Sequence, residues 1–126
     1  MTVQEAISQV DALCPNRYTI EDKVRWLNEV DARIDKEILS KYETAYEGGL
    51  PYTYTPYTVS DLSARLLAPA PYSTMYVYYL QSRINYADNE TDRYNNSSAM
   101  FNQAYFEFGN YFNSTQKALR HNLHFF

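Results

Sequence analysis

The chain has 126 residues, which is long enough for one domain with a single hydrophobic core. Apolar residues make up 45% and charged residues 21% of the sequence, a globular and not a disordered composition. The formal net charge is −4 and the sequence has no Lys/Arg cluster, so we expect no groove that binds nucleic acid through its phosphates.

No stretch is long and apolar enough to predict a membrane span, and the N-terminal MTVQEA lacks the basic and apolar regions of a signal peptide. We therefore expect no membrane partner. The single cysteine, Cys14, has no partner for an internal disulfide and is predicted to be a buried thiol in a reducing compartment.

The first predicted helix covers residues 3–13. Thr2 and Glu5 have the spacing of a capping box, in which each side chain bonds the other residue's backbone N–H. Pro15 and Asn16 are expected to end the helix. Its apolar positions are Val3, Ala6, Ile7, Val10, Leu13 and Cys14.

The second predicted helix covers residues 20–45. Thr19 is its expected N-cap, with Asp22 three residues on, and Gly48-Gly49 its expected stop. Trp26 falls off the apolar stripe, which makes it a candidate contact residue. The stripe consists of Ile20, Val24, Leu27, Val30, Ile34 and Ile38.

An arm of about residues 48–70 follows, rich in proline and tyrosine. It has room for a short extended segment or hairpin near residues 52–59 and for one turn from Ser60 to Leu67. Its tyrosines Tyr52, Tyr54 and Tyr57 favour an ordered segment that contacts a neighbouring chain, and we expect residues 50–59 to be dispensable for folding but needed for assembly. The alternative is that these tyrosines cover apolar surface of their own bundle.

Two further helices are predicted at residues 71–88 and 91–115, joined by a turn at 88–91. Pro71 suits the start of the first of them. Apolar residues recur at steps of three and four in both, so we expect the two helices to pack as a hairpin. The contacts that we expect join Phe101, Tyr105 and Phe108 to the face of Leu80 and Ile84.

Arg83 falls inside the apolar arc of the third helix, where a charge needs a partner. Glu90, Asp92 or a carboxylate of another subunit are the alternatives, unless the guanidinium reaches water along its aliphatic stem. The tail of about residues 114–126 ends in Phe125 and Phe126, which are expected either to pack on a chain or to fray.

No catalytic constellation is found in the sequence, so we expect no enzyme activity, no cofactor and no bound metal. His121 and His124 lack a third ligand nearby, and a Ser/His/Asp triad has no histidine outside this tail. The carboxylate pairs Glu21/Asp22 and Asp31/Asp35 are predicted to lie at capping or solvent-facing positions.

Several segments together resemble a family of small tailed-phage and prophage proteins. They are PNRYTIEDKVRWLNEVDARI at 15–34, LLAPAPY at 66–72, YYL at 78–80, INYADNE at 84–90 and DRYNNSSAMFNQAYFEF at 92–108. The likeness extends from the N-terminus to about Tyr111 and does not include the Tyr/Thr/Pro stretch at 50–59 or the terminal HNLHFF. These proteins resemble the head–tail connector, or adaptor, proteins of siphophage necks.

The resemblance implies a structural virion protein at the head–tail junction, made in the host cytoplasm. It implies a homo-oligomeric ring that lines the DNA channel and joins the portal protein to the next neck or tail-completion protein, without sequence-specific binding of nucleic acid. It carries over no site residue, because the family's functional surface is an interface. The alternative is a small prophage-encoded helical module that binds or regulates another protein.

The sequence thus predicts an all-α, four-helix, bundle-like single domain with a long central arm. The candidate interface residues are Trp26, Tyr52, Tyr54, Tyr57, Tyr78, Arg83, Tyr86, Phe125 and Phe126.

Overall fold

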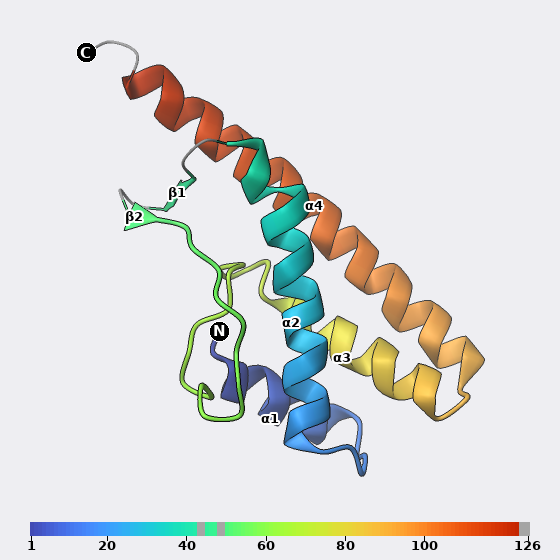
Figure 1. The fold of residues 1–126 in the computed structure, drawn as a ribbon. Coiled ribbons are helices and arrows are strands. Elements are labelled where there is room, and N and C mark those ends of the chain that lie inside the picture. Colours follow the sequence, from blue (N-terminus) through green and yellow to red (C-terminus); the bar gives the residue numbers. More distant parts are fainter. Residues whose placement is uncertain (43–44, 48–49, 124–126) are drawn as a thin grey trace.

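The computed structural model describes residues 1–42, 45–47 and 50–123 (Figure 1). The fold is all-α, as the periodicity predicts. Its α-helices are α1 (Val3–Leu13), α2 (Ile20–Glu37), α3 (Thr74–Ala87) and α4 (Thr91–Leu123). The short elements are the 3-10 helix η1 (Leu39–Lys41) and the two-residue strands β1 (Tyr46–Glu47) and β2 (Leu50–Pro51), which pair antiparallel.

Both N-terminal helices begin at the predicted capping boxes. Thr2 Oγ1 accepts the N–H of Glu5 at 3.1 Å, and Thr19 Oγ1 accepts the N–H of Asp22 at 3.1 Å. The acidic side chain returns a bond to the cap N–H in each case, so aspartate completes the second box in place of glutamate. Each cap satisfies orphan donors and stabilises its helix by about 1 kcal/mol.

The N-terminus lies beside the later part of the arm. The N–H of Val3 donates to the carbonyl of Ala64 at 3.0 Å, and the N–H of Leu66 donates to the carbonyl of Met1 at 3.0 Å. These bonds serve groups that a helix start leaves unpaired. They hold residues 62–66 against α1 and place the arm on the bundle.

α2 ends at Glu37, earlier than the predicted limit of residue 45. The chain tightens after Ile38 into η1, which turns Leu39 into the core, where it is 6% exposed. Tyr42 then donates its hydroxyl proton to Asn113 Oδ1 on α4 at 2.6 Å. Burial of these side chains therefore ends α2 before the limit that the apolar pattern predicts. The predicted stop, Gly48-Gly49, lies outside the described residues.

α3 and α4 form the predicted antiparallel hairpin. Its turn includes Asn89, which has a φ of 59° in the left-handed region that asparagine tolerates. α3 begins at Thr74 and not at Pro71, because the N–H groups of Tyr72 and Ser73 donate to the carbonyl of Pro69 in a preceding turn. The peptide bond between Ala70 and Pro71 is cis.

The core lies between the hairpin and α2, with α1 at one end (Figure 1). The predicted seam residues Phe101 and Phe108 are buried, together with Leu80 and Ile84. Tyr105 instead turns toward α2, where its hydroxyl donates to Glu37 Oε1 at 3.2 Å. Burying large aromatic rings supplies much of the driving force for such a core.

Two carboxamide side chains fix the chain, one at strand β1 and one beyond the β1–β2 ladder. Asn28 of α2 donates to the carbonyl of Tyr57 at 2.9 Å and accepts the Tyr57 N–H at 2.8 Å. Gln116 of α4 accepts the Tyr46 N–H at 3.1 Å and donates to the Tyr46 carbonyl. Each amide therefore pairs one residue's backbone as a neighbouring strand would.

Candidate functional site

Exposed apolar side chains mark the surfaces that a partner would contact. Three of them, Met100, Phe106 and Tyr111, belong to α4 and are 40%, 67% and 43% exposed. Met100 and Phe106 lie on different flanks of the helix, each beside a hollow of the surface. Tyr111 packs against Tyr72, with ring centroids 4.9 Å apart.

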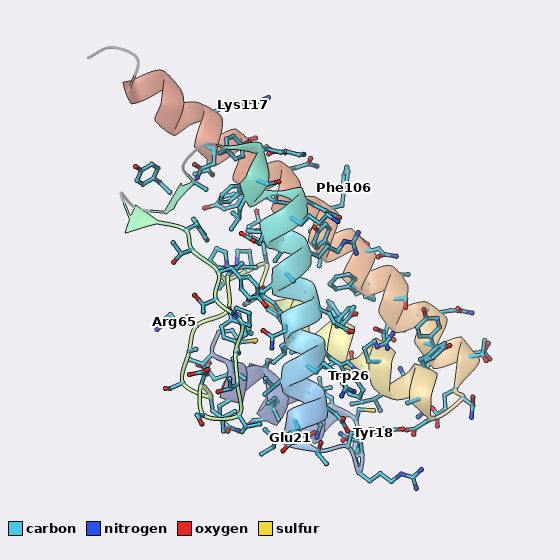
Figure 2. All side chains as sticks on the ribbon, viewed as in Figure 1. Tyr18, Glu21, Trp26, Arg65, Phe106 and Lys117 are labelled. Carbon is cyan, nitrogen blue, oxygen red and sulfur yellow. The ribbon has the colours of Figure 1, made fainter. Side chains whose placement is uncertain are left out.

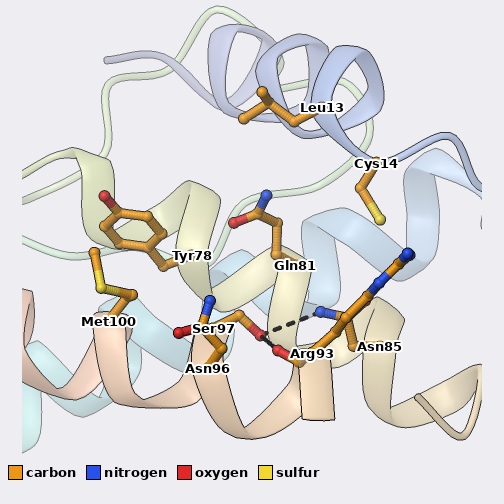
Figure 3. Close-up of a pocket in the computed structure, with 9 residues that line it drawn as sticks. All are labelled: Leu13, Cys14, Tyr78, Gln81, Asn85, Arg93, Asn96, Ser97 and Met100. Carbon is orange, nitrogen blue, oxygen red and sulfur yellow. Dashed lines mark hydrogen bonds between the residues drawn. The ribbon is translucent and has the colours of Figure 1, made fainter. Parts of the chain in front are cut away.

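The first hollow, which we call the α1-side hollow, lies between the end of α1, α3 and α4 (Figure 3). Its volume is about 490 Å³. Leu13, Tyr78 and Met100 give it an apolar rim, and Leu13 is 66% exposed. Asn85 donates to Ser97 Oγ at 3.2 Å at its polar base. The other lining residues are Cys14, Gln81, Arg93 and Asn96.

The second hollow, the α2-side hollow, lies between α2 and α4 and has a volume of about 470 Å³. Phe106 projects from its α4 edge (Figure 2). Arg33 pairs with Glu37 at 2.8 Å and stacks 4.2 Å above the ring of Tyr105. Hydrogen bonding to Arg33 lowers the pKa of Glu37, so the charge pair persists at neutral pH.

The two flanks differ in shape and chemistry. Met100 and Phe106 are six positions apart, which places them about 120° apart around an α-helix. One flank is a hollow with a thioether, a leucine and a tyrosine on its rim. The other carries a projecting phenylalanine among amides, since Asn102 and Asn110 line the same hollow. A subunit with two unlike surfaces can bind one copy on each side.

Trp26 is not an exposed contact residue. Its side chain is 5% exposed and packs edge-on against Tyr18, with ring centroids 5.6 Å apart. α2 therefore has a wider buried face than the predicted stripe. The ring closes the core between α2 and the α1–α2 connection, where Tyr18 also donates to Asp88 at 2.6 Å.

The arm tyrosines contact their own bundle, which is the alternative that we left open. Tyr52 packs edge-on against Phe112 at 5.1 Å, and Tyr54 donates to Asn28 Oδ1 at 2.9 Å. Tyr57 donates to Asp31 Oδ2 at 2.6 Å. All three are half-buried, so the expectation that residues 50–59 are dispensable for folding does not fit these contacts.

Tyr78 and Tyr86 keep surface that a partner can reach. Tyr78 is half-buried on the rim of the α1-side hollow. Tyr86 is 61% exposed near the hairpin turn and packs against Tyr94 with centroids 5.4 Å apart. They remain candidate contact residues, on different parts of α3.

Arg83 faces α2 rather than the hairpin turn. Its Nε lies 4.0 Å from Glu29 Oε1, and its guanidinium is 5.6 Å from the ring centroid of Tyr86. Glu90, one of the predicted alternatives beyond the turn, pairs instead with Arg93 at 3.0 Å. The ion pair that Arg83 makes among the described residues is with Glu29 and not with Glu90 or Asp92. The side chain as a whole is 37% exposed, although its Nε is buried and has no hydrogen-bond partner among the described residues.

The terminal candidates Phe125 and Phe126, like His124, lie outside the described residues. His121 belongs to α4, whose bounds reach Leu123. Over the described ranges 1–42, 45–47 and 50–123, no group of three or more His, Cys, Asp or Glu side chains could hold a metal ion. Cys14 is half-buried, and burial raises the pKa of its thiol.

Asp31 is the main residue whose environment the sequence analysis placed incorrectly. The carboxylate is 0% exposed and not solvent-facing. Tyr57 and Tyr76 donate to its two oxygens, each at 2.6 Å, and the N–H of Leu67 donates at 3.1 Å. Burial raises the pKa of Asp31 despite these bonds. The signal was its spacing, because Asp31 lies four residues after Leu27, inside the apolar stripe.

The same carboxylate affects the tyrosines around it. Burial and the nearby charge raise the pKa of Tyr57 and of Tyr76, so both hydroxyls stay protonated and act as donors. The oxygen of Tyr76 also accepts the N–H of Ala68 at 2.7 Å. This cluster joins α2, α3 and the arm, and it has the character of a structural contact.

Comparison with protein-family models, with curated proteins and with solved structures returned no match. Within the described residues, no helix has the length and apolarity that crossing a membrane requires.

Proposed function

We propose that this protein is a structural component of a phage head–tail junction, where copies of the chain form a ring between the portal and the next neck or tail component. The observation that carries the proposal is the pair of unlike, partly apolar flanks on α4. The resemblance of the segments between residues 15 and 108 to connector proteins supports the same assignment.

A closed ring needs two different surfaces on each subunit, because a head-to-tail contact joins one patch to another. The α1-side hollow, with Leu13 and Met100 on its rim, offers one patch. The flank around Phe106 offers the other. Exposed aromatic and methionine side chains are enriched at the centres of protein interfaces.

The charge of the chain is compatible with a DNA channel. An acidic surface repels the phosphate backbone and lets DNA pass without adhering. The formal net charge is −4, and exposed carboxylates gather near the hairpin turn at Asp88, Glu90 and Asp92. A ring lined by such groups would guide DNA without reading its sequence.

A mixing experiment tests the two-flank ring. Met100→Asp places a charge in the first flank, and Phe106→Asp places one in the second. Either variant alone should fail to form rings on portal-bearing heads from the encoding phage or prophage. An equimolar mixture should form dimers and no larger species, because each variant keeps one intact flank. Mass by light scattering and incorporation into heads are the measurements.

The matched control is Ser114→Asp, which adds the same charge at an exposed position of α4. This variant should assemble like the wild-type protein. If both flank variants join heads normally, or if the wild-type protein never joins them, the ring proposal is wrong. A wild-type chain that stays monomeric beside heads would favour the regulatory binding module.

A further inference from the structure

Asp31 connects three parts of the molecule that are far apart in sequence. It lies on α2, Tyr76 lies on α3, and Tyr57 and Leu67 belong to the arm. We infer that Asp31 makes a pH-sensitive contact that holds the arm on the bundle, with the neutral carboxyl holding the arm more tightly than the carboxylate. This inference is independent of the proposed ring.

The geometry leaves the negative charge without a cation. The ion pairs of the described residues involve the carboxylates of Asp11, Asp22, Glu29, Glu37 and Glu90. Asp31 instead receives two hydroxyl groups and one N–H, and has no exposed surface. Hydrogen bonds to an ionised group offset only part of the cost of removing it from water.

Among the described residues, the groups that face this site from each element add no positive charge. The arm contributes the hydroxyl of Tyr57, whose ring centroid lies 5.8 Å from that of Tyr54. α3 contributes the Tyr76 hydroxyl, and α2 itself adds Asp35, whose charge acts on Tyr54. Arg65 is exposed and contributes its backbone carbonyl, which accepts from Tyr57 at 3.3 Å.

The direction of the pH dependence follows from these surroundings. With the arm docked, burial raises the pKa of Asp31 above its ordinary 3.8. With the arm lifted, water reaches the carboxylate and the pKa returns toward that value. The docked state therefore binds the proton more strongly, so acid favours docking, and docking weakens as pH rises from the ordinary pKa to the raised one.

Hydrogen exchange at the Tyr57 amide, corrected for the intrinsic rate at each pH, measures how often the arm opens. This amide donates to Asn28, so it exchanges when the arm lifts. In the wild-type protein the opening constant should rise with pH by at most tenfold per unit above about 3.8 and then level off.

Asp31→Asn should give a flat opening constant over the same range, because the side chain no longer titrates. Asp35→Asn is the matched control, since Asp35 is an exposed carboxylate one turn along α2, and it should keep the wild-type rise. Equal pH profiles for the wild-type protein and Asp31→Asn would overturn the inference.

A carboxyl NMR titration of the wild-type protein keeps the test decisive if Asp31→Asn does not fold. The Asp31 carboxyl should titrate above 3.8, and Tyr57→Phe should move the midpoint higher, because it removes a bond that favours the charged form. Tyr105→Phe, which removes a hydroxyl that donates to Glu37, should leave the midpoint in place. A wild-type midpoint at or below 3.8 would refute the inference.

Discussion

The α3–α4 hairpin and the segment between Tyr46 and Tyr57 are held to the molecule by different forces. The hairpin buries rings along a seam, with Phe108 and Phe112 at 0% and 1% exposure. The segment is fixed by hydrogen bonds from Asn28 and Gln116 to backbone groups. The stability gained from apolar burial is non-directional and is spread over many side chains of the seam. A contact made by hydrogen bonds is lost when the one side chain that forms them is removed.

The largest effect that separates the two regions should come from the hairpin core. Phe108→Ala leaves a cavity and should lower the free energy of unfolding by about 3–5 kcal/mol. Phe106→Ala, two positions away and 67% exposed, should change it by less than about 0.5 kcal/mol. Chemical denaturation monitored by circular dichroism measures both. Similar losses for the two variants would contradict the assignment of the buried face.

The second largest loss of stability is expected from a substitution of Asn28, which holds the segment between Tyr46 and Tyr57. Asn28→Ala removes both bonds to the Tyr57 backbone and the acceptor of the Tyr54 hydroxyl, and should cost about 1–3 kcal/mol. Amide exchange should speed up at Tyr57 before it does in α4. Asn102→Ala, at an exposed amide of α4, is the control and should be nearly neutral. Uniform loss of protection over the whole chain would show that the arm and bundle unfold together.

A smaller loss of stability is expected at Gln116, which holds the backbone of Tyr46. Gln116→Ala removes two bonds to Tyr46 at a side chain that is 2% exposed. Because Asn28→Ala removes three bonds, we expect the smaller loss of about 1–2 kcal/mol here. Gln116→Glu places a carboxylate against the Tyr46 carbonyl at a buried position, so at neutral pH it should cost more than Gln116→Ala. Thermal unfolding measures the series, and a loss for Gln116→Glu no larger than that for Gln116→Ala would contradict the buried contact.

The smallest change is expected when glycine replaces Asn89 in the hairpin turn. Asn89→Gly keeps the left-handed conformation available and should alter stability by no more than about 0.5 kcal/mol. Asn89→Ala should cost about 1–2 kcal/mol, because a Cβ without a compensating side-chain bond is strained at positive φ. Equal stability of the glycine and alanine variants would show that the turn relaxes to another conformation.

Periodicity and caps predicted the helices because both depend on residues close in sequence. Thr2 with Glu5 marked the start of α1 at the correct residue, and the step-of-three-and-four pattern found Phe101 and Phe108. The end of α2 was missed because it depends on how Ile38 and Leu39 meet the core, which involves residues about 70 positions away. Long-range packing leaves no local pattern at a helix end.

The polar contacts were harder to predict from the sequence than the helix ends. Asp31 lies at a core position of α2, but a charged residue there was assigned to solvent because isolated charges are costly to bury. Its partners Tyr57 and Tyr76 are 26 and 45 positions away. Asn28 gives no periodic signal at all. Among the candidate contact residues, Tyr78 of α3 lines the α1-side hollow. The sequence analysis assigned Phe106 to no interface, because its helix face depends on the packing of α2.

The bonds that hold Tyr46 and Tyr57 to the helices also determine where this chain can accept additional residues. Gln116 holds Tyr46, and Tyr52, Tyr54 and Tyr57 contact the bundle. An insertion between Glu47 and Leu50 leaves these contacts in place and adds mainly loop entropy. That cost grows slowly, by about 0.6 kcal/mol for each doubling of a flexible loop. The segment is therefore a place where an epitope or a fluorescent label can be inserted genetically, and where related chains can diverge in length without shifting the helices.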